Sequence, residues 1–125
     1  MKNNIVKNKN FEFAIRIVKL YQYVSNEKKE FILSKQLLRS GTSIGAMIRE
    51  AEHAESKSDF IHKFAIAQKE ANKVIYWLEL LKATDYLNQK EFENINNDAV
   101  SILKLITSII KTSKSQLSKS RLLPN

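Results

Sequence analysis

Two acid–histidine pairs contain the side-chain types that bind metal ions in helical proteins. Glu50 and His53 are three residues apart, as are Asp59 and His62, so each pair shares one face of a helix. Some four-helix bundles hold two iron ions with two Glu-x-x-His elements and two further glutamates. Here both pairs flank one predicted hairpin instead of lying at the middle of a bundle, and one pair uses Asp. We therefore predict solvated or capping side chains and no metal site.

Nucleophilic catalysis has equally little support in the sequence. The chain contains no cysteine, which excludes a disulfide, a thiolate metal site and a cysteine nucleophile. Ser40 and Ser43 are predicted to lie within a helix, and neither histidine is within a turn of them. A glycine-rich phosphate loop and a nucleophile elbow are also missing. The sequence predicts no enzymatic activity and no cofactor.

The positive charge of the chain is concentrated toward its two ends. Residues 1–40 hold nine basic and three acidic residues (+6), residues 41–98 hold seven and ten (−3), and residues 99–125 hold five and none (+5), which gives +8. Such a surface suits a polyanion such as RNA, although excess lysine also keeps a protein soluble. The candidate nucleic-acid-binding residues lie at the start of the second predicted helix and along the fourth: Lys28, Lys29, Lys35, Arg39, Lys104, Lys111 and Lys114.

The only two glycines of the chain, Gly41 and Gly45, lie four residues apart. Each costs about 1 kcal/mol relative to alanine within a helix, and together they leave one helix face without side chains. They continue an apolar seam, so we predict one unbroken helix that is closely approached by a neighbour, the alanine-rich third helix. Arg39 and Arg49 flank this patch. An Arg–Glu pair with Glu50 that bridges helices or subunits is favoured over direct contact with nucleic acid.

Apolar spacing predicts four amphipathic helices that must position these residues. They cover about residues 10–24, 27–55, 59–84 and 89–111. Asn26 is a candidate cap for the second helix, and Ser56 with Asp59 resembles a capping box before the third. The polar, basic residues 112–120 are expected to fray. The predicted organisation is a bundle over residues 1–115 and a basic, disordered tail over residues 116–125.

Short connections between long helices make neighbours antiparallel, so the predicted fold class is all-α, an antiparallel up-down-up-down four-helix bundle. Several apolar residues fall outside the core seams, and a contiguous set of them would mark the interface of a homo-oligomer. These residues are Ile32, Leu33, Leu38, Ile66, Tyr76, Leu80 and Leu105. No apolar stretch reaches the roughly 20 residues of a membrane span, and the N-terminal residues lack a signal-peptide core. A soluble, cytoplasmic protein without a membrane partner is expected.

The segment at residues 36–45, Gln-Leu-Leu-Arg-Ser-Gly-Thr-Ser-Ile-Gly, is specific enough to carry a family resemblance. Together with Arg49-Glu50-Ala51, Ser56-Lys57-Ser58-Asp59-Phe60 and Tyr76-Trp77-Leu78, it closely resembles the bacterial four helix bundle protein family. Members of this family are also called proteins of the intervening sequence in large-subunit ribosomal RNA genes. The resemblance covers most of the chain.

The resemblance implies a small bundle that assembles into a ring, a pentamer, and whose molecular role is not established. A related branch, the accessory variability protein of diversity-generating retroelements, resembles a basic pentameric barrel that engages a reverse transcriptase and nucleic acid. Met47 stands where the family has Asn, and Lys73-Val74 where it has Glu-Thr, so a polar contact made by that Asn and Glu must differ here. The candidate helix-packing or interface residues are Arg39, Ser40, Gly41, Ser43, Gly45, Arg49, Glu50, Tyr76 and Trp77.

Three functions are compatible with these patterns. The first is a non-enzymatic, homo-oligomeric protein that binds RNA or DNA through phosphate contacts with lysines. The second is a protein-interaction scaffold or accessory subunit, for example of a reverse transcriptase, without direct binding of nucleic acid. The third is a metal-dependent enzyme built on the two acid–histidine pairs.

Overall fold

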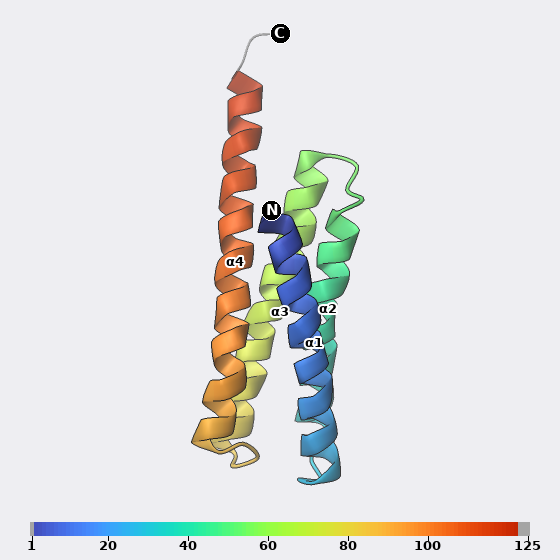
Figure 1. The fold of residues 1–125 in the computed structure, drawn as a ribbon, viewed down its shortest axis with the longest axis vertical. Coiled ribbons are helices and arrows are strands. Elements are labelled where there is room, and N and C mark those ends of the chain that lie inside the picture. Colours follow the sequence, from blue (N-terminus) through green and yellow to red (C-terminus); the bar gives the residue numbers. More distant parts are fainter. Residues whose placement is uncertain (1, 123–125) are drawn as a thin grey trace.

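The computed structural model describes residues 2–122, and within them all regular structure is helical (Figure 1). The helices are α1 (Lys2–Asn26), α2 (Leu33–Ala51), α3 (Lys57–Ala83) and α4 (Gln89–Leu122). Each helix contacts the next one in the chain, and α1 also contacts α4, so the four helices pack as a bundle. None of the helices in residues 2–122 has the length and apolarity needed to cross a lipid bilayer.

The turn between α1 and α2 differs from the prediction, which began the second helix at residue 27. α1 continues through Asn26, which is therefore not a cap, and Lys29 takes a left-handed conformation with φ of 58°. The buried carboxylate of Glu30 accepts hydrogen bonds from the backbone N–H groups of residues 32, 33 and 34 at 3.0, 2.9 and 2.7 Å. Because these bonds satisfy the free donors of the first turn, α2 begins at Leu33. It ends at Ala51, four residues before the predicted end.

Side-chain caps start α3 and α4. The Oγ atom of Ser56 accepts a hydrogen bond from the backbone N–H of Asp59 at 3.0 Å, which confirms the predicted cap. Before α4, the N–H of Glu91 donates to Oδ1 of Asn88 at 2.8 Å, and the N–H of Asn88 donates to Oε1 of Glu91 at 2.9 Å. These reciprocal bonds have the geometry of a capping box and fix the start of α4 where the sequence predicts it.

The outer ends of α1 and α4 extend further than predicted. α1 begins at Lys2 instead of near residue 10, because Val6 and Asn10, 0% and 1% exposed, continue its buried face. α4 continues to Leu122, so the helix end predicted at residue 111 is wrong. The segment 116–122 of the expected disordered tail is helical, and residues 123–125 lie outside the described residues.

The length of α3 explains the extension of α4. α3 starts at Lys57, whose Nζ donates a hydrogen bond to Oε1 of Gln116 on α4 at 3.1 Å. Further along, Nε2 of Gln68 donates to Oγ1 of Thr107 at 2.9 Å. In these two contacts, a higher residue number on α3 is matched by a lower residue number on α4. α4 must therefore continue past residue 112 to cover the start of α3. Ser113 is accordingly only 4% exposed.

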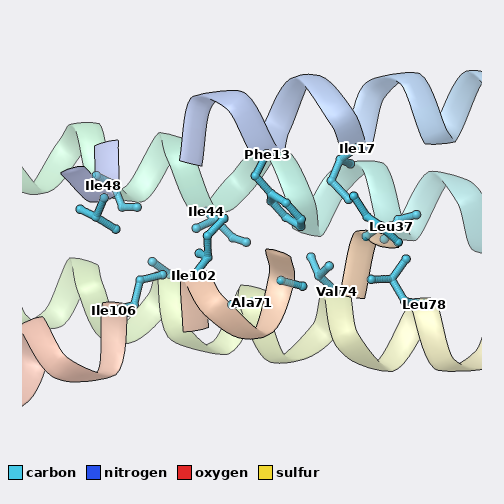
Figure 2. Close-up of a cluster of buried hydrophobic side chains, with 14 of the residues drawn as sticks. Phe13, Ile17, Leu37, Ile44, Ile48, Ala71, Val74, Leu78, Ile102 and Ile106 are labelled. Atoms are coloured by element: carbon cyan, nitrogen blue, oxygen red, sulfur yellow. The ribbon is translucent and has the colours of Figure 1, made fainter. Parts of the chain in front are cut away.

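Apolar side chains from all four helices meet inside the bundle (Figure 2). Ten of them are labelled in Figure 2, and none of these is more than 3% exposed: Phe13, Ile17, Leu37, Ile44, Ile48, Ala71, Val74, Leu78, Ile102 and Ile106. Burial of a large apolar side chain contributes about 1.5–3 kcal/mol. The apolar seams read from the sequence therefore form one shared core.

α2 is unbroken at residues 40–46, as the glycine-containing seam predicts. The neighbour that approaches the glycines is α1, so the prediction of the alanine-rich third helix as that neighbour is wrong. A Cβ atom added to Gly41 would lie 2.7 Å from Cγ2 of Ile17, and one added to Gly45 would lie 2.5 Å from Oδ1 of Asn10. The missing side chains of the two glycines thus set the distance between α1 and α2.

Candidate functional site

α4 carries exposed lysines from its middle toward its C-terminal end, with no acidic side chain among them. Lys104, Lys111 and Lys114 are exposed, and no ion pair within residues 2–122 involves them. Their spacings of seven and three residues place them on one face of the helix. Residues 99–125 contain no Asp or Glu. These three residues, which we call the α4 lysine row, can neutralise several phosphate groups along one edge of the bundle.

The remaining basic candidates lie far from the end of α4. Lys28 and Lys29 in the α1–α2 turn, and Lys35 and Arg39 in the first half of α2, are all exposed. In Figure 1 this turn lies at the same end of the bundle as the start of α4, whereas the second half of α4 reaches the opposite end. Lys35 and Arg39 also lie on α2, which makes no contact with α4 among the described residues.

The small residues of the predicted interface pack within the chain. Gly41 and Gly45 lie against α1, as described above. Ser40 is 3% exposed. These three residues therefore hold the bundle together, and a second molecule could not reach Gly41 or Ser40 without opening it.

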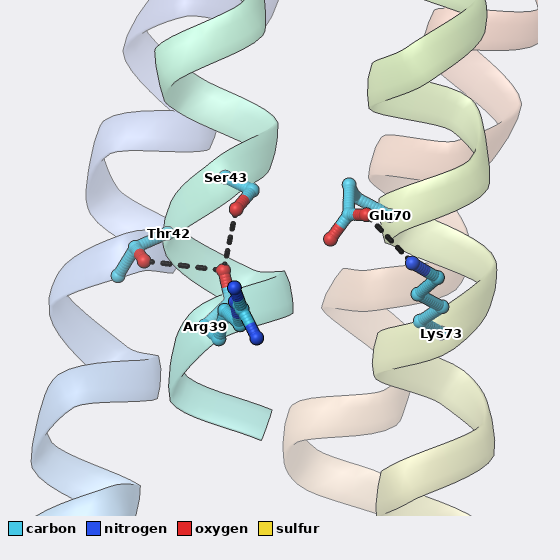
Figure 3. A network of polar contacts seen from close by, with 5 residues as sticks. All are labelled: Arg39, Thr42, Ser43, Glu70 and Lys73. Carbon is cyan, nitrogen blue, oxygen red and sulfur yellow. Dashed lines mark hydrogen bonds and ion pairs between the residues drawn. The ribbon is translucent and has the colours of Figure 1, made fainter. Parts of the chain in front are cut away.

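Arg39 and Ser43 lie on the surface where α2 faces α3 (Figure 3). The hydroxyl groups of Ser43 and Thr42 donate to the backbone carbonyl of Arg39 at 2.7 and 3.3 Å. On α3, Lys73 pairs with Glu70 at 3.0 Å. Each of these contacts joins residues of the same helix. Among the described residues, no carboxylate forms an ion pair with the exposed guanidinium group of Arg39. Lys73 pairs along its own helix and makes no ion pair to α2.

Within the described chain, Arg49 and Glu50 contact different helices and form no ion pair with each other, while an Arg–Glu pair between subunits stays a prediction. The guanidinium carbon of Arg49 lies 5.6 Å from the centroid of the Phe11 ring on α1. Glu50 pairs with Lys63 of α3 at 3.1 Å. Arg49 therefore joins α2 to α1 through a cation–π contact, and Glu50 joins α2 to α3.

Tyr76 and Trp77 form an aromatic pair on α3. Tyr76 is 59% exposed, and its ring packs edge-on against that of Trp77 with 5.0 Å between centroids. Trp77 is half-buried, and its Nε1 donor is buried without a hydrogen-bond partner among residues 2–122. A buried donor without a partner costs free energy. Tyr76 is therefore the accessible member of the pair, whereas Nε1 of Trp77 is buried within the chain.

α1 exposes an apolar stripe that the sequence reading missed. Phe11, Ile15 and Val18 are 56%, 42% and 37% exposed, and spacings of four and three residues place them on one helix face. The spacing of these three residues is the sequence signal that could have identified the stripe. Most residues predicted to lie off the core seams are only half-exposed instead: Leu33, Leu38, Ile66, Leu80 and Leu105.

The acid–histidine pairs serve helix ends and ion pairs. Asp59 takes part in the cap of α3, Glu50 pairs with Lys63, and His53 and His62 are exposed. Within residues 2–122, no group of three or more His, Cys, Asp or Glu side chains is placed to hold a metal ion. Within the described part of the chain, the four side chains are therefore not gathered into one cluster.

Comparisons with known proteins agree with the helical architecture. Residues 2–108 match the family described as 23S rRNA-intervening sequence protein. Among solved structures, the chain is similar to a protein with unknown function from the S23 ribosomal protein family of Bacteroides thetaiotaomicron VPI-5482. The two are 61% identical with a TM-score of 0.87, and the match covers 89% of this chain and 99% of that one. No curated protein matches.

Proposed function

This chain belongs to the 23S rRNA-intervening sequence protein family, and from that premise we propose that it is a non-enzymatic, homo-oligomeric protein that binds RNA or DNA through exposed lysines. An up-down-up-down order of the helices, a ring-like pentameric assembly and a cytoplasmic location belong to this proposal. The observation that carries it is the α4 lysine row.

The dimensions of the α4 lysine row suit a nucleic-acid backbone. A helix rises 1.5 Å per residue, so Lys104 and Lys114 are about 15 Å apart along the helix axis. A strand carries one phosphate per about 3.4 Å, so roughly four phosphates lie alongside the row. Because the row holds no carboxylate, phosphates can approach it without repulsion.

The proposal is tested by measuring binding of a fluorescent single-stranded RNA at several salt concentrations. Neutralising three phosphates of a single strand gives a slope of about −2 in log affinity against log salt. From 50 to 200 mM salt, these three contacts then account for an affinity loss on the order of 20-fold. The triple variant Lys104→Glu, Lys111→Glu and Lys114→Glu is expected to lose this slope and most of the affinity.

A second triple variant controls for net charge. Lys57, Lys69 and Lys73 are exposed on α3, and their reversal to Glu changes the net charge by the same amount. We expect this control to keep most of the binding of the wild type. Equal losses of RNA affinity in both variants would show that only the net charge matters and not the α4 lysine row. Absence of RNA binding by the wild type at low salt would refute the proposal.

Self-association is supported by the exposed stripe of Phe11, Ile15 and Val18 on α1. A contiguous exposed apolar surface is typical of a protein interface. Light scattering measures the mass directly, and Val18→Asp is expected to reduce it if the stripe lies between subunits. A monomeric wild type at micromolar concentration would contradict the oligomeric part of the proposal.

The second candidate function is an accessory subunit or scaffold that binds a protein, for example a reverse transcriptase, and not nucleic acid. The exposed Tyr76, whose ring packs edge-on against Trp77, favours it, since such aromatic residues are enriched at interfaces. This function replaces the first one if the wild type does not bind RNA at low salt and Tyr76→Ala abolishes binding to a protein partner.

A further inference from the structure

A groove lies between α1 and α4 in the half of the bundle that contains the α1–α2 turn. It has a volume of about 410 Å³, and its walls include Lys19, Leu20 and Tyr23 of α1 and Lys90 and Ile95 of α4. Figure 1 shows α1 and α4 separating toward this end of the bundle. None of the residues that line the groove is among the candidate site residues predicted from the sequence.

The inner surface of the groove is apolar and aromatic. Ile95 is 4% exposed, and Leu20 and Tyr23 are partly buried against the core. The Tyr23 ring is accompanied by a cation, because Nζ of Lys28 lies 5.8 Å from its centroid. A flat, apolar ring entering the groove therefore meets aliphatic carbon and the Tyr23 phenol.

The rim of the groove is positively charged. Lys19 on α1 and Lys90 on α4 are exposed, and no ion pair within residues 2–122 involves either of them. The acidic side chain of the rim, Glu91, is occupied as the cap of α4. An anion at the rim thus meets two available ammonium groups, one from each helix.

The charged pair at the edge of the groove does not cancel this positive charge. Arg16 forms an ion pair with Asp98 and also donates a hydrogen bond to Asn94. These contacts neutralise Arg16 and Asp98 together and connect the two helices above the groove. Lys19, Lys28 and Lys90 are opposed by the Glu91 carboxylate, which leaves a net charge of +2 around Tyr23.

We propose that this groove binds one nucleotide, with the base against Tyr23 and Leu20 and the phosphate between Lys19 and Lys90. The proposal deepens the nucleic-acid function proposed above and rests on it for the polymeric ligand. Base stacking on aromatic side chains tolerates any sequence, and it requires an unpaired base. The groove therefore selects single strands over duplexes, while the α4 lysine row contacts phosphates of either.

The experiment compares a labelled single-stranded 12-nucleotide RNA, the corresponding duplex and a free mononucleotide in binding titrations with the full chain. Tyr23→Leu is expected to weaken binding of the single strand on the order of tenfold and to leave duplex binding unchanged. Tyr23→Phe keeps the ring and is expected to bind like the wild type. Tyr21→Leu, a half-buried tyrosine outside the groove on the same helix, is the matched control for folding.

A second pair of variants tests the rim. Lys19→Glu with Lys90→Glu is expected to weaken binding of both the single strand and the mononucleotide. The matched reversal of Lys69 and Lys73 on α3 is expected to leave mononucleotide binding unchanged. Binding of the mononucleotide alone, without RNA binding, would support the groove and refute the nucleic-acid function.

Three results would overturn the inference. The first is that Tyr23→Leu binds the single strand as tightly as the wild type does. If charge reversal of the α4 lysine row still abolishes binding, the proposed function stands and only the groove is refuted. The second is equal loss in Tyr23→Leu and Tyr23→Phe, since the ring would then have no role. The third is a change in the mass of Tyr23→Leu by light scattering, because the groove would then lie between subunits.

Discussion

α1 packs against its two neighbours in opposite ways. On the α2 side, Gly41 and Gly45 let the helix backbones approach so closely that an added Cβ would collide with Ile17 or Asn10. On the α4 side, Arg16 joins the helices through Asp98, and grooves of about 180 and 410 Å³ lie along the contact. The α1–α2 contact is therefore closed at Gly41, although a pocket of about 200 Å³ lies beside Gly45. We call the contact around Gly41 the closed side of α1 and the contact with α4 its open side.

The difference shows how side-chain size divides structural and binding roles. At Gly41, the branched side chain of Ile17 fills the space left by the missing side chain, and no room is left there for a ligand. Where long polar side chains hold the helices apart, apolar surface and free lysines line a groove. We expect the α1–α2 side to determine stability and the α1–α4 side to determine binding.

Ile17 and Gly41 give the largest expected effects on stability. Ile17→Ala is expected to lower the free energy of unfolding by about 2–5 kcal/mol, because the side chain is fully buried and its loss leaves a cavity. Gly41→Ala combines an overpacking cost of about 1–3 kcal/mol with a gain of about 1 kcal/mol in helix propensity. The net loss is then about 0–2 kcal/mol, measured by urea unfolding.

The double variant Ile17→Ala with Gly41→Ala tests whether the two effects share one contact. Because the smaller side chain makes room for the new Cβ, Gly41→Ala is expected to become stabilising in this background. Gly45→Ala is the matched control, since Oδ1 of Asn10 ends a short side chain that can turn away. A stabilising Gly41→Ala in the wild type would disprove the tight contact.

Substitution of Glu30 tests how much the turn between α1 and α2 contributes to stability. Burial raises the pKa of Glu30, but hydrogen bonds from the backbone of Leu33, Ser34 and Ile32 outweigh it, so the pKa lies below its ordinary value of 4.5. Since the folded pKa is lowered, the carboxylate contributes stability above about pH 4.5 that is lost as the pH falls through the folded value. Glu30→Gln is expected to cost about 1 kcal/mol at pH 7.

The pH dependence separates this cap from general acid unfolding. The difference in unfolding free energy between the wild type and Glu30→Gln is expected to shrink as the pH falls below 4.5. An unchanged difference between pH 7 and pH 3 would show that the charge of Glu30 does not cap α2.

Arg16 gives the smallest expected effect, because its contact lies on the open side. The Arg16 and Asp98 side chains are 39% and 47% exposed, and such ion pairs contribute about 0–1 kcal/mol. Arg16→Met, which keeps an apolar stem, is expected to change the free energy of unfolding by less than about 1 kcal/mol. A loss comparable to that of Gly41→Ala would mean that both sides of α1 support the fold equally.

Periodicity and capping signals predicted much of the fold because they depend on neighbouring residues. The seam of Leu37, Gly41, Ile44 and Ile48 predicted an unbroken α2, and Ser56 marked the start of α3. The start of α2 could not be read in the same way. Glu30 acts as a cap only because the chain folds back on itself at Lys29.

The sequence predicted which residue types would be exposed for binding, but it did not predict where these residues lie relative to one another in the bundle. Exposure of the α4 lysine row follows from helical spacing, whereas the separation of the two basic sets depends on how the helices lie in the bundle. The groove at Tyr23 brings together residues about 70 positions apart, Lys19 and Lys90. Sequence spacing contains no signal for such a pair.

By itself, the sequence determined four amphipathic helices, their polar breaks and the face of α2 that lacks side chains, because each of these properties repeats within one or two helical turns. Only the tertiary structure decided that α1 fills the glycine face, that α4 must extend to cover α3, and that α1 and α4 leave a groove between them. The reason is that a helix encodes which of its faces is buried, while the partner of that face depends on the packing of all four helices at once.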